Sequence, residues 1–264
     1  MIRLNNLEDA DRRIVDRLGS FSVLEYVKDS SVSVSNAVNE YFMAEMGVRR
    51  RQLIIDLDGS NSAILQAGAM QCMFGNVNAT TGIKGVGDLF GKVVKSKVTN
   101  ESALKPEYVG TGTIILEPTY KYIVLQDVAK WGPAGMVVED GMFFASEGSV
   151  EQKVVARSNL SSAIAGGEGL FNLCLKGHGI AALESNVPAA ELIEIDLDND
   201  VVKIDGSFAV CWSASLAFTV ERSSKSLIGS AVNKEGLVNV YRGTGKILCC
   251  LTAPTSSLYA ATHN

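Results

Sequence analysis

The feature that most constrains the fold is a glycine motif that recurs at a nearly constant spacing. Gly-x-Gly occurs at residues 110–112, 177–179 and 243–245, and the steps between the first glycines (177 − 110 and 243 − 177) are 67 and 66 residues. A short apolar run of β-forming residues follows each copy. Such self-similarity indicates one structural unit used three times along the chain.

A second glycine marks a turn in each copy, and in the last two copies an aspartate precedes it. Asp-Gly is typical of a hairpin turn. The markers together predict one compact body over residues 1–264, made of three repeats (about 20–117, 118–185 and 186–252) behind a short N-terminal extension. We expect the repeat glycines to form structural corners, because glycine adopts positive φ and admits close backbone contacts; they are Gly68, Gly110, Gly112, Gly141, Gly177, Gly179, Gly206, Gly243 and Gly245.

Short alternating segments fill each copy. Runs such as 122–125, 192–195 and 238–241 are rich in β-forming residues and are bounded by turn residues, which favours strands. We therefore predict an all-β fold in which three small sheets are related by a pseudo-threefold axis. One helix is expected over Asn6–Leu18, where apolar residues recur at near-helical spacing. After residue 20, no segment sustains helical periodicity for three turns.

Composition places the chain among ordinary globular proteins, with 47% hydrophobic and 20% charged residues. No apolar stretch approaches the roughly 18 residues that a membrane span needs, and the first residues have no secretory core. We therefore expect a cytoplasmic protein. Its net charge of −5 makes a general nucleic-acid surface unlikely, since such surfaces are usually basic. The five cysteines lack disulfide or metal spacing and are interpreted as small buried hydrophobes.

Known catalytic and metal-binding patterns are missing from the sequence. Of the two histidines, His178 fills a position that is threonine in the other copies, and His263 lies in the C-terminal tail. The glycine-rich stretch 82–92 is no phosphate loop, because Val93 follows Lys92 where a serine or threonine is needed. We therefore expect a protein that is not an enzyme and has no catalytic, cofactor-binding or metal-binding residues.

Two groups of basic residues are the candidate site for an anionic partner. Arg49, Arg50 and Arg51 precede a predicted strand, and the insertion of the first repeat holds Lys92, Lys95, Lys97 and Lys105, of which the first three are counted in the patch. On a strand, Arg49 and Arg51 would share one face and Arg50 would take the other. The patch could contact phosphate or an acidic surface. The alternative is charge that keeps an exposed loop and strand edge in solution.

Three segments carry a resemblance to a known family. Residues 66–77 (QAGAMQCMFGNV), 167–171 (GEGLF) and 235–245 (EGLVNVYRGTG) resemble the "altered inheritance of mitochondria, twenty-four" family. Its members are similar in fold to the tryptophan RNA-binding attenuation protein (TRAP). The resemblance spans about Phe21 to Leu251 and implies a TRAP-like unit, a short double-stranded β-helix or β-sandwich, repeated three times. It also implies a homotrimer, and it supplies no catalytic residues.

Three hypotheses for function follow from these observations. The favoured one is a non-catalytic homo-oligomeric scaffold or binding protein with an unknown macromolecular partner. An alternative is RNA or other nucleic-acid binding through the basic patch. A second alternative is a small-molecule or enzyme site between repeats, where ligand pockets often occur.

Overall fold

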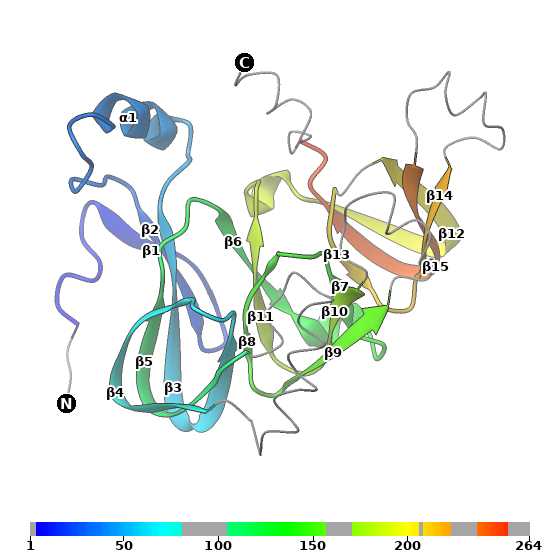
Figure 1. Ribbon diagram of the computed structural model, residues 1–264, viewed down its shortest axis with the longest axis horizontal. Coiled ribbons are helices and arrows are strands. Elements are labelled where there is room, and N and C mark those ends of the chain that lie inside the picture. Colours follow the sequence, from blue (N-terminus) through cyan, green and yellow to red (C-terminus); the bar gives the residue numbers. More distant parts are fainter. Residues whose placement is uncertain (1–3, 81–104, 157–170, 206–207, 223–236, 253–264) are drawn as a thin grey trace.

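The protein is built almost entirely of antiparallel strands. The computed structural model describes residues 4–80, 105–156, 171–205, 208–222 and 237–252, and its strands form two curled sheets (Figure 1). The first sheet holds β1 (Arg12–Leu18), β2 (Phe21–Tyr26), β3 (Arg51–Leu65), β4 (Met70–Thr80), β5 (Glu107–Leu116), β6 (Tyr122–Asp127), β8 (Phe143–Glu147) and β11 (Ile180–Ser185). The second holds β7 (Met136–Val138), β9 (Val150–Ala156), β10 (Phe171–Gly177), β12 (Ile193–Asp205), β13 (Ala209–Ser213), β14 (Ala217–Arg222) and β15 (Leu237–Cys249). The predicted all-β class is confirmed.

Helical structure is sparse in the described ranges. The α-helix α1 (Ala37–Glu45) stands beyond the ends of β1 and β2 in Figure 1, and the short 3-10 helices are η1 (Val128–Trp131) and η2 (Ala189–Glu191). Within the described ranges, no helix has the length and apolar character to cross a membrane.

The strands form where apolar residues alternate. On β3, Leu53, Ile55 and Leu57 enter the core of the first sheet, whereas Ile54 points to the opposite face and packs with Leu24. This is the two-residue period of a strand with both faces covered. At the end of β15, Cys249 and Cys250 belong to different core clusters for the same reason.

One core cluster joins the two sheets. It contains Phe143 and Leu183 from the first sheet together with Val138, Leu175 and Val210 from the second. Direct strand pairing links neighbouring segments as well, because β3 pairs with β8 and β7 pairs with β13. The prediction of three small sheets is therefore wrong. The middle segment gives β6, β8 and β11 to one sheet and β7, β9 and β10 to the other.

The same strand pairing recurs in the three predicted segments. β3 pairs with β5 and β12 pairs with β15, and each register shifts opposite the Gly-x-Gly motif, between Asp58 and Ser62 and between Leu197 and Asp200. In the middle segment the corresponding partners are divided, so that β6 pairs with β11 and β7 with β10. The pseudo-threefold axis itself stays a prediction.

The repeat glycines take up the expected backbone conformation. All of those in the described ranges have positive φ: Gly68, Gly110, Gly112, Gly141, Gly177, Gly179, Gly243 and Gly245; Gly206 lies outside these ranges. The requirement is strict at Gly110, with φ of 123°, where a Cβ atom would overlap the carbonyl oxygen of Asn76 on β4. Glycine at this position therefore lets β4 and β5 approach each other.

Two local predictions are wrong for tertiary reasons. Arg12–Leu18 of the expected helix Asn6–Leu18 is strand β1, because β2 pairs with it from Arg12 to Leu18 and hydrogen-bonds its backbone. Asp140 and Gly141 form a turn, but β7 before it and β8 after it lie in different sheets. The turn therefore carries the chain between sheets and does not close a hairpin.

Candidate functional site

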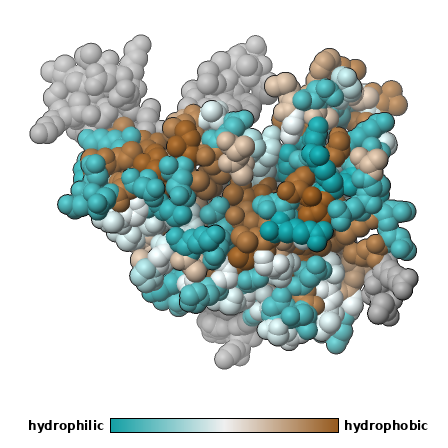
Figure 2. Space-filling model, turned by 180° about the vertical axis from the view of Figure 1, so that it is seen from behind, coloured by the Kyte–Doolittle hydropathy of each residue, from teal (hydrophilic) through white to brown (hydrophobic). Residues whose placement is uncertain are grey.

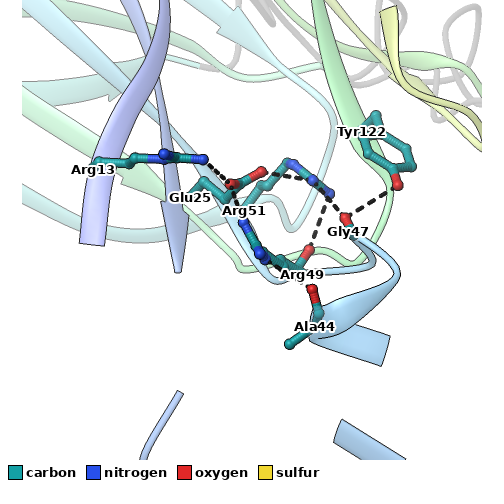
Figure 3. A network of polar contacts seen from close by, with 7 residues as sticks. All are labelled: Arg13, Glu25, Ala44, Gly47, Arg49, Arg51 and Tyr122. Carbon is teal, nitrogen blue, oxygen red and sulfur yellow. Dashed lines mark hydrogen bonds and ion pairs between the residues drawn. The ribbon is translucent and has the colours of Figure 1, made fainter. Parts of the chain in front are cut away.

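The three consecutive arginines lie at the start of β3, after α1, and two of them, Arg49 and Arg51, contact a buried carboxylate. Glu25 on β2 accepts hydrogen bonds from Arg51 at 2.7 Å, Arg49 at 3.2 Å and Arg13 at 3.3 Å (Figure 3). Arg51 and Glu25 are both buried, whereas Arg13 on β1 reaches the cluster from the surface. We call these four side chains the Glu25 cluster.

Opposing effects set the ionisation of Glu25. Burial alone would raise the pKa of its carboxyl, but the charge of Arg51 and the hydrogen bonds from Arg51, Arg49 and Arg13 outweigh burial and leave the pKa below its usual value. Three cations around one anion leave an excess of positive charge. Backbone carbonyl groups offset part of it, because Arg49 Nε donates to Ala44 O at 3.2 Å and Arg51 Nη2 donates to Gly47 O at 3.0 Å.

The Glu25 cluster also fixes the end of α1. Ala44 and Gly47 lie at the C-terminal end of that helix, where carbonyl groups lack helical partners and the helix dipole favours cations. Tyr122 on β6 adds two contacts, since its hydroxyl donates to Gly47 O at 3.1 Å and its ring lies 4.0 Å below the Arg51 guanidinium (Figure 3). Residues far apart in sequence therefore hold the helix end together.

The side chain of Arg50 does not join the Glu25 cluster. It forms an ion pair with Asp29, and its guanidinium lies 6.0 Å from the ring of Tyr120. Arg49 and Arg51 thus contact one carboxylate and Arg50 another, although only Arg51 of the three lies within β3. All three arginines contact acidic side chains of this chain, which argues against an open anion-binding patch at these positions. Lys92, Lys95 and Lys97 lie outside the described residues.

The helix α1 presents apolar side chains to solvent. None of its nine residues is buried, and Val38, Tyr41 and Phe42 are between 61% and 66% exposed. Their i, i+3, i+4 spacing places them on one face, where Glu45 continues the row. We call these four residues the α1 stripe. The inner side of α1 is attached by Tyr120, whose hydroxyl donates to Glu40 at 2.7 Å. In Figure 2, apolar surface is broken into several areas, and α1 lies at the upper right.

Sequence reasoning missed the acidic centre of the cluster and the stripe. A signal existed for Glu25, because it is the charged residue within the apolar run 21–26, and a charge in such a run needs a partner. The stripe had a signal as well, in the spacing of Val38, Tyr41 and Phe42. Tyr122 had none, because its role depends on a contact with a distant segment.

The cysteines form no reactive centre in the described ranges. Four are buried and Cys72 is half-buried, and burial raises the pKa of all five thiols, that of Cys249 to about 11. Thiols with raised pKa are poor nucleophiles at neutral pH. No group of three or more metal-ligating side chains occurs among the described residues.

Comparisons with known proteins agree with the fold. The chain is 32% identical over 203 residues to an uncharacterised protein of Streptococcus pyogenes serotype M6, which covers 73% of this chain and 78% of that protein. It is also similar to a protein of Streptococcus pyogenes solved by X-ray crystallography, with a TM-score of 0.58 and 26% identity over 81% of this chain and 93% of the other.

The family model described as "Mitochondrial biogenesis AIM24" matches residues 45–250. These residues begin at the last residue of α1 and include the three arginines, β3 and nearly all of both sheets. The chain belongs to the AIM24 mitochondrial biogenesis family.

Proposed function

We propose that this protein is a non-catalytic, homo-oligomeric scaffold whose copies join through the free edges of their sheets and present repeated surfaces to a macromolecular partner. The observation that carries this proposal is the position of its exposed large hydrophobic residues. Five of the twelve lie on strands that pair on one side only within the described residues: Val15 on β1, Met73 on β4, Val154 on β9, and Ile193 and Val201 on β12.

Free strand edges are sites where a second chain can add. They carry unpaired backbone N–H and C=O groups, and proteins that stay monomeric usually protect them with charge or bulges. Charged residues and register shifts occur on these edges as well, as between Leu197 and Asp200 of β12, but exposed apolar side chains lie beside them, and pairing with another copy would cover both the backbone groups and this apolar surface.

The two ends of the second sheet favour a ring. Its strand order runs from β12 to β9, with β14 as a further edge strand on β15. Joining one edge to a different edge of the next copy is a head-to-tail contact, which forms a ring when the rotation between copies closes. We infer a trimer of pseudo-threefold, TRAP-like chains. The recurring strand pairing in the three segments supports this inference.

Light scattering coupled to size-exclusion chromatography tests the proposal. A trimer has three times the monomer mass of 28.1 kDa. Val201→Lys on β12 and Val154→Lys on β9 should each reduce the assembly to monomers, because either change places a charge in the same contact. Leu251→Lys is the matched control, since Leu251 is 49% exposed and lies outside the strands. A monomeric wild type, or an intact assembly in both edge variants, would contradict the proposal.

A further inference from the structure

The α1 stripe is an apolar surface that faces away from the body. Val38, Tyr41 and Phe42 lie on its exposed side, and the rings of Tyr41 and Phe42 are in edge-to-face contact at 5.5 Å. Amphipathic helices normally direct such a row toward the core. The Glu25 cluster and Tyr122 hold the helix so that this row points outward. An outward apolar row on a fixed helix is typical of a surface that a partner covers.

We propose that α1 pairs with α1 of a second copy, antiparallel across a twofold axis. The midpoint of the stripe in sequence lies between Tyr41 and Phe42, so an antiparallel neighbour places Tyr41 of one helix against Phe42 of the other. The stripe is therefore complementary to itself, as a twofold contact requires. Val38 then lies against Glu45 of the second copy.

Charge complementarity selects the antiparallel direction. Glu45 is in the last turn of α1, which has no basic residue, and the N-cap residue Asn36 makes no side-chain capping hydrogen bond. An acidic group is unfavourable at the C-terminal end of its own helix and favourable at the N-terminal end of another. Antiparallel pairing brings Glu45 to the first turn of the second helix, whose own acidic residue, Glu40, accepts a hydrogen bond from Tyr120 on the inner side of α1. Parallel pairing would bring the two Glu45 side chains together.

The contact is small, so the association should be weak. Nine residues span about 13 Å of helix. Val34 and Met46, 96% and 80% exposed, extend the apolar surface at the two ends of the helix. A contact along one helix of this length buries less than the roughly 800 Å² per partner of a standard interface. The helix pair would therefore form at high micromolar concentration and double the mass of whatever assembly the sheet edges make. It does not depend on the proposed trimer.

Sedimentation over a concentration series tests the pairing. We expect the average mass of the wild type to double between about 1 µM and about 500 µM, the mass of Phe42→Lys to stay constant, and the control Leu251→Lys to behave like the wild type. The pairing is overturned if the wild type shows no doubling, or if Phe42→Lys doubles as the wild type does. The two proposals can fail separately. If the trimer does not exist but the helices pair, the mass rises from that of a monomer to that of a dimer. If the helices do not pair, the mass stays constant over the concentration series.

The geometry has its own tests. In a Cys72→Ser background, Tyr41→Cys lies near the axis and should form an intermolecular disulfide under mild oxidation, whereas Asn39→Cys, on another side of the helix, should not. Equal cross-linking of both would overturn the proposed face. Glu45→Gln should weaken the association about two- to fivefold, because an attraction to a helix N-terminus is lost. Stronger association of Glu45→Gln would overturn the antiparallel direction.

Discussion

Nη2 of Arg51 and Oε2 of Glu25 lie 2.7 Å apart at the centre of a cluster in which three guanidinium groups share one carboxylate. The pair joins β3 to β2, and through Gly47 it also fixes the end of α1. A buried ion pair seldom adds much stability compared with apolar residues of the same size, but removing one partner leaves an uncompensated buried charge. The cluster is therefore a sensitive point of this fold.

Replacing Glu25 by Gln should lower the free energy of unfolding by about 3 kcal/mol, because Arg51 stays buried without its anion. Urea denaturation measures the change. The control is Glu8→Gln, since Glu8 pairs with Arg17 on the surface at 3.4 Å, and such exposed pairs contribute at most about 1 kcal/mol. If Glu25→Gln and Glu8→Gln lowered the free energy of unfolding equally, burial of the ion pair would not be the reason for the large effect at Glu25.

Glu25 should make the folded protein less stable as the pH is lowered into the acid range. Its pKa in the folded protein lies below the value of about 4.3 in an unfolded chain, so the folded state binds fewer protons. The contribution of Glu25 is thus fully present above that value and is lost as pH falls toward the folded pKa. Melting temperatures of wild type and Glu25→Gln should differ most at neutral pH and converge below about pH 4. A constant difference down to pH 3 would disprove this linkage.

Removing the hydroxyl of Tyr122 should loosen α1 without unfolding the protein. Tyr122→Phe keeps the ring under Arg51 but loses the hydrogen bond to Gly47 O. A loss of about 1 kcal/mol corresponds to roughly fivefold faster local opening. Hydrogen exchange of the amides in α1 measures it. Tyr26→Phe, which loses a hydroxyl bonded to Gln52, should leave exchange in α1 unchanged.

Replacing the corner glycines by alanine should separate two contributions to the loss of stability, namely backbone strain at positive φ and overlap of the new Cβ with a neighbouring strand. Gly110→Ala should cost more than about 3 kcal/mol, because strain at positive φ adds to overlap with Asn76 O. Gly141→Ala, where φ is 76° and no atom lies within 4 Å of the added Cβ, should cost about 1–2 kcal/mol from strain alone. Thermal unfolding of both variants makes the comparison, and equal costs would disprove the close-contact role.

The all-β class and the glycine corners were predictable from the residues alone, because both follow from local rules. Alternation of apolar residues predicts a strand wherever it occurs, as in 238–241 of β15, and glycine is favoured where φ is positive, as at Gly110. The two-residue period also predicted that Arg49 and Arg51 lie on a different side from Arg50, although β3 begins only at Arg51. These features depend on each residue and its near neighbours, so one sequence was enough to find them.

Which segments pair with each other could not be predicted from local rules. Residues 12–18 could form a helix or a strand, and pairing with β2 made them a strand. The turn at Asp140 and Gly141 could be predicted from its residues, but the assignment of β7 and β8 to different sheets could not. Arg51 is buried because Glu25 and Tyr122, both distant in sequence, contact it. The physical reason is common to all three: long-range hydrogen bonds and burial outweigh local preference, and neither is written in the spacing of neighbouring residues.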